Sequence, residues 1–202
     1  MLGRIVLATC LVAVTGSGRC AGSDALQLVQ DTTARMVQAL DKNRKAIVAD
    51  ENRLYPLVEE IILPHFDFER MSRSVLGRYW RDLAPEDQQR FVAEFRTLLV
   101  RTYATAMLEY SGQKIVYLPV RAKAEDVEVT IQTRVQQASG FPIPIDYFLY
   151  QDSGRWRVYN MSIDDVDLVL NYRTSFARTI REDGNVSGLI AKLHESNQQA
   201  MQ

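Results

Sequence analysis

The 202-residue chain carries 24 lysine and arginine residues against 25 aspartate and glutamate residues, a formal net charge of −1 at pH 7. A nucleic-acid-binding domain is usually strongly basic, so this balance argues against that class of protein. The hydrophobic fraction of 47% is ordinary for a globular protein that buries a core.

The first 22 residues are typical of a secretory leader rather than of a folded domain. Arg4 supplies a basic start, and an apolar run from Ile5 to Val14 precedes small and polar residues. The run is shorter than the roughly 20 apolar residues that span a bilayer. We expect residues 1–22 to be a signal peptide cleaved near Gly22–Ser23, and residues 23–202 to form a single domain. An anchor or a tail is the alternative for the leader.

Both cysteines, Cys10 and Cys20, lie in this predicted leader. Its removal takes away two arginines and no acid, which leaves 22 basic and 25 acidic residues, a net charge of −3. A chain without thiols suits an oxidising compartment. Such a chain cannot form disulfides, cysteine–zinc sites or cysteine nucleophiles.

The first half of the mature chain predicts helices. Apolar residues recur every four positions from Asp24 to about Arg44, as in an amphipathic helix, and a charged helix end and loop should fill residues 41–51. Tyr55-Pro56 can open a short helix, because proline is tolerated in the first turn, and Pro64 should end it.

Two more helices follow with clear start signals. Asp67 is suited to cap a helix that contains Gly77, although glycine lowers helix propensity. Pro85 fits the first turn of a long helix that runs to about Tyr110. The predicted buried face of this long helix consists of Phe91, Phe95, Leu98, Leu99, Thr102 and Ala106.

Beyond Ser111-Gly112 the apolar period changes to that of strands. Valine and isoleucine alternate with polar residues from Val127 to Val135, the clearest strand pattern in the chain. Turns are expected at Ser139-Gly140 and at Asp152-Ser153-Gly154. The other strands are predicted at Lys114–Leu118, Ile145–Tyr150 and Trp156–Ile163.

A final pair of helices is predicted after the strands. Asp165 or Asp167 can cap the first, Gly184-Asn185 breaks it, and a short helix should span Val186–His194. The whole order predicts an α+β fold, in which helices pack over a curved antiparallel sheet of about four strands. Such a fold can enclose an apolar cavity.

The residue types give little support for catalysis. Neither His65 nor His194 belongs to a nucleophile or metal motif, and no nucleotide-binding glycine motif is present, so we predict no metal and no cofactor. Asp146 is the most suggestive residue, because a carboxylate buried in an apolar strand can act as a general base. The alternative is that Asp146 faces solvent or pairs with Arg134 or Arg157.

A cluster of three acids near the last strand, Asp164, Asp165 and Asp167, also invites a functional interpretation. A calcium loop would need more oxygen donors at alternating positions and a central glycine. We therefore interpret the cluster as a turn followed by a helix cap.

The stretch from Pro64 to Arg181, roughly two thirds of the mature chain, carries a family resemblance in several short blocks. They are His65–Phe68, Arg70-Met71, Val75–Trp80, Phe95–Ala104, Pro142–Tyr147, Trp156–Tyr159 and Asn171–Phe176. In combination they resemble the MlaC family, the periplasmic phospholipid-binding components of the Mla intermembrane transport system, also known as toluene-tolerance proteins.

The resemblance implies a fold related to the NTF2-like cone and a lipid whose acyl chains insert into the protein. It also implies a location in the periplasm of a Gram-negative bacterium. The implied partners are phospholipid, the inner-membrane Mla ABC transporter complex with its MlaD component, and the outer-membrane MlaA–porin complex. Related proteins are associated with hopanoids, so the class of lipid stays open.

Physical chemistry supports a carrier of this kind. A phospholipid exposes about 30 methylenes, each worth about 0.8 kcal/mol on transfer from water, so a carrier must replace that contact with an apolar wall. Two acyl chains need a cavity on the order of 1,000 Å³, and the charged headgroup should remain in water at its mouth. The residues predicted to contact the chains are Leu76, Tyr79, Phe95, Leu99, Tyr103, Tyr147, Leu149, Val158, Tyr172 and Phe176.

The sequence thus predicts a soluble carrier, not an enzyme, that shuttles lipid between the two membranes and maintains outer-membrane lipid asymmetry. Two alternatives from other classes stay open. One is a small curved-sheet enzyme with Asp146 as base and a nearby tyrosine as acid. The other is a scaffold or binding module that takes no phospholipid.

Overall fold

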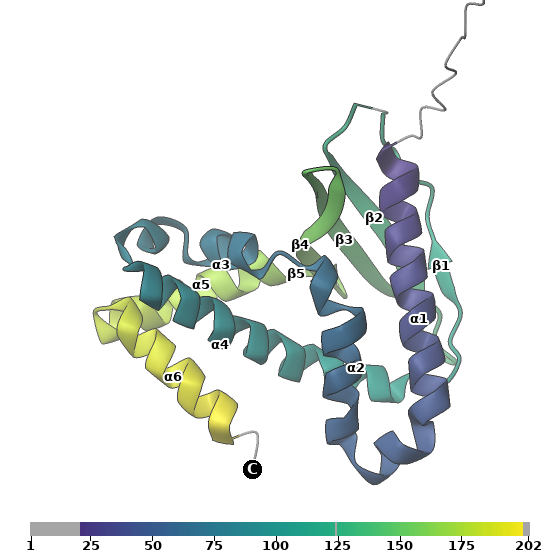
Figure 1. The fold of residues 1–202 in the computed structure, drawn as a ribbon, viewed down its shortest axis with the longest axis horizontal. Helices are drawn as coiled ribbons and strands as arrows, with labels where there is room; N and C mark the ends of the chain where they lie inside the picture. The colour runs from purple at the N-terminus through teal and green to yellow at the C-terminus, as the bar shows by residue number, and fades with distance from the viewer. Residues whose placement is uncertain (1–20, 124, 200–202) are drawn as a thin grey trace, which may run out of the picture.

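The structure is a computed structural model that describes residues 21–123 and 125–199. In these residues six α-helices and a five-stranded antiparallel sheet form the α+β fold that the sequence predicts (Figure 1). Nearly all of the predicted leader lies outside the described residues. Its last two residues, Ala21 and Gly22, already belong to the first helix.

The first helix, α1 (Ala21–Ala49), is longer than expected. Residues 41–49, predicted as a helix end and loop, continue the helix because Ile47 extends the buried stripe of Met36 and Leu40 against α2 (Leu54–Ile61). The charged side chains of this segment occupy the solvent side.

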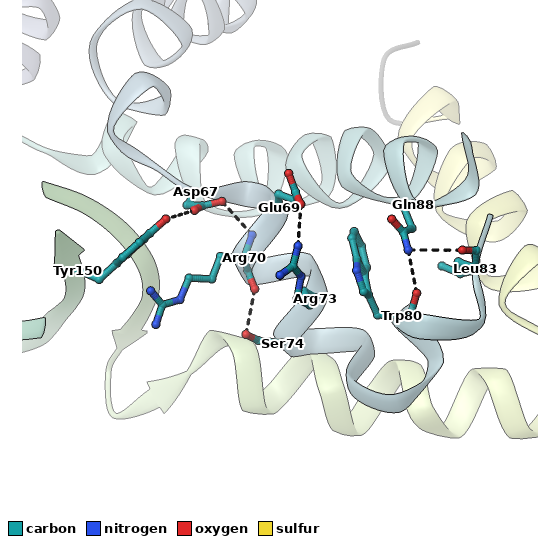
Figure 2. Close-up of polar contacts among 9 residues, drawn as sticks. All are labelled: Asp67, Glu69, Arg70, Arg73, Ser74, Trp80, Leu83, Gln88 and Tyr150. Carbon is teal, nitrogen blue, oxygen red and sulfur yellow. Dashed lines mark hydrogen bonds and ion pairs between the residues drawn. The ribbon is translucent and has the colours of Figure 1, made fainter. Parts of the chain in front are cut away.

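Helix α3 (Phe68–Leu76) begins as predicted. The Asp67 carboxylate accepts a hydrogen bond from the Arg70 backbone N–H at 2.8 Å and so caps the helix (Figure 2). The prediction that Gly77 lies inside the helix is wrong. Gly77 has a φ of +55°, which no helical residue adopts, and it ends α3 and opens a 3₁₀ segment, Gly77–Asp82.

Helix α4 (Pro85–Ala104) starts at its proline and buries Phe91, Phe95 and Leu99, as predicted. Thr102 and Ala106 are exposed instead of buried, and a 3₁₀ segment, Thr105–Glu109, replaces the last turns. The reason is a second neighbour: the end of the helix packs against α2 through Val100 and Ala104, while Tyr103 still contacts the helices on the other side, and Thr102 and Ala106 contact neither.

The strands are β1 (Ile115–Tyr117), β2 (Glu128–Val135), β3 (Ile143–Asp152), β4 (Arg155–Ile163) and the two-residue β5 (Val166–Asp167). They follow one another in the sheet in chain order, every neighbour antiparallel. Four of them are the predicted strands. Val127, the first residue of the predicted alternation, precedes β2 and is 61% exposed.

Helices α5 (Leu168–Asp183) and α6 (Val186–Gln199) complete the chain. Asp167 caps α5 by accepting the Leu170 N–H at 2.8 Å, and Asp164 and Asp165 form the tight turn before β5, so the acidic cluster is the predicted turn and cap. Helix α6 extends beyond His194 because Asn197 is buried against α4, where its amide donates to the Glu94 carboxylate at 2.7 Å.

The buried apolar residues form three clusters. The helical cluster joins α3, α4, α5 and α6; the sheet cluster joins the start of α1 to β2, β3 and β4; and the α1–α2 cluster joins these helices to the end of α4. Figure 1 shows α1 running along the sheet and α3 to α6 stacked beyond its β4–β5 edge. Among the helices of residues 21–123 and 125–199, none is both long and apolar enough to cross a membrane.

Candidate functional site

One face of the sheet is apolar except for the buried Thr133, and we call it the inner face. The strand register aligns its side chains in three rows across β2, β3 and β4. The rows are Val129–Leu149–Val158, Ile131–Tyr147–Met161 and Thr133–Ile145–Ile163.

The row nearest the start of α1 is closed. Leu149 is 0% exposed, Val129 and Val158 are buried, and Ala25 and Val29 of α1 cover them. This end of the inner face is a packed core, and it has no room for a ligand.

The other end of the inner face is covered only in part. Its apolar side chains are half-buried: Tyr117, Ile145, Tyr147, Met161 and Ile163, which we call the open wall. Met161 packs against both the sheet cluster and the helical cluster, so the wall lies where the two clusters meet. Partly solvated apolar side chains on a curved sheet are typical of a site for an apolar ligand.

One pair of tyrosines, Tyr117 and Tyr147, belongs to the open wall, and a second pair, Tyr103 and Tyr172, packs against the helical cluster. Burial, together with the neighbouring Tyr117, raises the pKa of Tyr147 to about 12. Burial, together with a hydrogen bond to Tyr172, raises the pKa of Tyr103 to about 12. Both hydroxyls are therefore neutral at physiological pH, which suits contact with hydrocarbon better than proton transfer.

A groove of about 530 Å³ runs between α1 and the β1 edge and reaches Tyr117, the neighbour of Tyr147. Gln30, Ala34 and Val37 form its α1 side. A second hollow, of about 320 Å³, has a more polar lining that includes Arg121, Glu128 and Gln132. Both hollows are open and smaller than the volume on the order of 1,000 Å³ that two acyl chains need. The enclosed apolar cavity stays a prediction.

The ten residues predicted to contact acyl chains fall into two groups, and none of them lines either hollow. Leu76, Phe95, Leu99 and Phe176 are buried in the helical cluster, with Tyr79, Tyr103 and Tyr172 packed against it. Leu149 and Val158 are buried in the sheet cluster, with Tyr147 packed against it.

Sequence reasoning missed most of the open wall. Tyr117, Ile145, Met161 and Ile163 were not among the predicted contacts, although the alternation within each strand puts Ile145 on the same side as Tyr147. The pairing of β3 with β4, which brings Met161 beside Tyr147, depends on a bulge at Phe148/Leu149 that no short pattern announces.

Asp146 lies on the opposite face of the sheet. Its carboxylate accepts hydrogen bonds from the Gln132 amide at 2.9 Å and from the Arg134 guanidinium at 3.2 Å. The structure thus confirms the ion pair with Arg134 as the alternative to a general base. In the described part of the chain, no group of three or more histidines, cysteines and acids could hold a metal ion.

A polar cluster on that outer face fastens α3 to the sheet. The Arg70 guanidinium lies between the rings of Tyr150 and Tyr159, at 4.0 and 4.2 Å from their centroids, and its Nη2 is 2.6 Å from the Glu128 carboxylate. The Tyr150 hydroxyl donates a hydrogen bond to the Asp67 carboxylate, and Figure 2 shows this contact beside Arg70. We call these residues the α3–sheet cluster.

The Asp67 carboxylate at the centre of this cluster is held in its charged form. Partial burial opposes the charge, but hydrogen bonds from the Arg70 N–H and the Tyr150 hydroxyl and the charges of Arg157 and Arg70 lower its pKa below the usual value. The Asp67 backbone N–H also donates to the Val158 carbonyl at 2.8 Å. These contacts fix the N-terminal end of α3, and with it one end of the helical layer, to β4.

A family model described as MlaC protein matches residues 30–195. This chain belongs to the MlaC family. It is 30% identical over 160 residues to the toluene tolerance protein ttg2D of Pseudomonas putida, covering 78% of this chain and 74% of that protein. It is 26% identical over 175 residues to the intermembrane phospholipid transport system binding protein MlaC of Haemophilus influenzae, covering 85% and 81%.

The MlaC fold is also confirmed by a solved structure. A phospholipid-binding protein from Ralstonia solanacearum, determined in complex with a phospholipid, matches with a TM-score of 0.82 and 31% sequence identity. The match covers 89% of this chain and 99% of the other. The family resemblance found in the sequence is thus confirmed by sequence and by structure.

Proposed function

We propose that this protein is a periplasmic carrier that binds the acyl chains of a phospholipid between the open wall of the sheet and the helical layer. The observation that carries the proposal is the match to a phospholipid complex at a TM-score of 0.82 over 99% of that chain. The half-buried apolar wall supports it, because a contiguous apolar patch that stays partly exposed is typical of a ligand or partner site.

The open wall and the tyrosines opposite it make the first contacts with the chains. Among the ten predicted residues, four tyrosines are half-buried and available in this conformation: Tyr79, Tyr103, Tyr147 and Tyr172. The close-packed members, such as Phe95 and Leu99, are reached only when the layers move apart. Each methylene that leaves water for this wall contributes about 0.8 kcal/mol to binding.

Loading requires the two layers to separate, because the hollows of 320 and 530 Å³ are too small for two chains. The α3–sheet cluster lies on the face opposite the open wall and serves as the pivot. Its hydrogen bonds and ion pair stay intact while Met161 and Ile163 part from the helical cluster.

Transport follows from binding without any covalent chemistry. The carrier takes lipid at one membrane complex and releases it at another, the outer-membrane MlaA–porin complex and the inner-membrane Mla ABC transporter with its MlaD component, and so maintains outer-membrane lipid asymmetry. The leader pattern of residues 1–22 supports export to the periplasm. Hydrolysis of ATP belongs to the transporter.

Organic extraction of the protein purified from its own compartment, followed by mass spectrometry, tests the proposal. We expect phospholipid at near one molecule per protein, and none in a sample unfolded in urea, washed and refolded. Extracts that contain only hopanoid would correct the lipid class. Extracts free of any lipid would contradict the carrier.

A further inference from the structure

Three arginines lie around Gly77 and Tyr79 at the surface of the helical layer. Arg78 precedes Tyr79 in the 3₁₀ segment Gly77–Asp82, and Arg173 and Arg181 come from α5. The three arginines line neither hollow, and Tyr79, one of the ten residues predicted to contact acyl chains, packs against the helical cluster. We call Arg78, Tyr79, Arg173 and Arg181 the arginine site.

Contacts place two of the guanidinium groups at the tyrosine hydroxyl. Arg78 Nη2 donates to Tyr79 Oη at 3.0 Å, and its guanidinium carbon is 4.9 Å from the ring centroid. The hydrogen bond from Arg78 and the charges of Arg78 and Arg181 lower the pKa of Tyr79. The local field is therefore positive.

Gly77 brings the third guanidinium group into the same place. Arg173 Nη2 lies 3.3 Å from the position that a Cβ on Gly77 would occupy. A side chain at position 77 would crowd Arg173, and the φ of +55° would strain it further. The bare backbone thus lets Arg173 approach the residue next to Arg78.

Among residues 21–123 and 125–199, the charges of the site have no counter-ion. Across the described ranges, no carboxylate forms an ion pair with any of the three arginines, although Asp82 and Glu182 are close in sequence. The nearby Arg73 differs, since it is paired with Glu69 at 2.8 Å, as Figure 2 shows. Like charges held together without an anion repel one another.

We propose that Arg78, Arg173 and Arg181 form a binding site for a phosphate group. Guanidinium groups match phosphate oxygens in charge and geometry and form paired hydrogen bonds with them. The Tyr79 hydroxyl, which accepts from Arg78, keeps its own proton to donate to a phosphate oxygen. The phosphate comes either from a soluble phosphate ester or from a lipid headgroup presented at a membrane surface.

The first experiment is a titration of the whole protein with inorganic phosphate, followed by NMR of the arginine Nε–Hε signals, against sodium chloride at equal ionic strength. We expect saturable shifts of Arg78, Arg173 and Arg181 with phosphate only. The triple variant R78Q/R173Q/R181Q should lose them. Each single variant should weaken binding about fivefold, the equivalent of roughly 1 kcal/mol for each basic side chain.

The second experiment separates the two sources of phosphate by co-sedimentation with vesicles. The site is assigned to lipid headgroups if the parent binds vesicles that contain phosphatidylglycerol but not vesicles of phosphatidylcholine alone, and if the triple variant loses this binding. Shifts with inorganic phosphate and no vesicle binding assign it to a soluble ester. The exposed and ion-paired Arg73 supplies the control variant R73Q, which should bind like the parent.

The proposal is overturned when neither phosphate nor vesicles bind, or when the triple variant binds both as well as the parent does. It is also overturned when these arginines are needed only for binding to another protein. All three arginines are exposed, so the variants should fold, which urea unfolding verifies. Lipid extracted from the triple variant should match the parent, which keeps this test independent of the carrier function.

Discussion

Leu149 and Ile145 lie four residues apart in β3 and point to the same face of the sheet. Leu149 is 0% exposed beneath α1, whereas Ile145 is half-buried in the open wall. Both side chains are aliphatic and similar in size, so the difference in their exposure comes from what covers each residue. A packed core stabilises the fold at one end of the face, and the same kind of surface stays partly uncovered at the other, where we propose that lipid binds.

The largest effect is expected where the face is closed. Leu149→Ala should lower the free energy of unfolding by about 2–5 kcal/mol, because it removes a fully buried side chain and leaves a cavity. Urea unfolding measures this loss. Ile145→Ala is the matched control, and a loss as large as that of Leu149→Ala would show that the open wall is also packed core.

Filling the open wall should affect lipid more than stability. Ile145→Trp should weaken binding of a fluorescent phospholipid about tenfold, because overpacking costs roughly 1–3 kcal/mol and 1.4 kcal/mol is a factor of ten. Thr130→Trp places the same ring on the outer face, where Thr130 is exposed, and should leave affinity unchanged. Equal losses in both variants would remove the distinction between the faces.

The α3–sheet cluster should contribute to stability in a pH-dependent way. The lowered pKa of Asp67 means that its carboxylate stabilises the fold fully above its unfolded pKa of about 3.9 and loses this effect as pH falls through the folded pKa. Asp67→Asn keeps a good helix cap but removes the charge, so it should cost about 1–2 kcal/mol at pH 7.

Urea unfolding of both proteins at several pH values measures this difference. The gap between parent and Asp67→Asn should close in strong acid. A gap that stays constant down to pH 2 would mean that the Asp67 charge contributes nothing.

Asp146→Asn should have the smallest effect. The variant breaks a partly exposed ion pair with Arg134, which is worth about 0–1 kcal/mol. It should leave phospholipid affinity unchanged, because Asp146 lies on the face opposite the open wall. Loss of a measurable turnover in this variant would restore the enzyme hypothesis.

The sequence predicted helices and strands well where a single residue or a short pattern determines where the element begins and which face is apolar. Asp67 and Asp167 cap their helices, Pro85 opens α4, and the alternation in β2 follows from one polar and one apolar face. Gly77 was misplaced because propensity does not reveal a positive φ.

The candidate site was less predictable because it depends on which apolar side chains are covered by other helices and strands. Phe95 and Tyr103 both belong to the apolar side of α4, yet Phe95 is sealed by α5 and Tyr103 is half-buried. Thr102 is exposed because the end of α4 packs against α2 through Ala104 and against the other helices through Tyr103, which leaves Thr102 on the uncovered side. Which residues are covered depends on how elements far apart in the sequence pack together, and the sequence patterns of single elements do not give that packing.

Photo-crosslinking tests the central claim most directly. The photoreactive p-benzoylphenylalanine replaces Ile145 in one protein and Thr130 in another, each is irradiated with its co-purified lipid, and intact mass is measured. The account predicts a phospholipid adduct at position 145 and none at position 130. Adducts at position 130 alone, or at neither position in lipid-loaded protein, would contradict it.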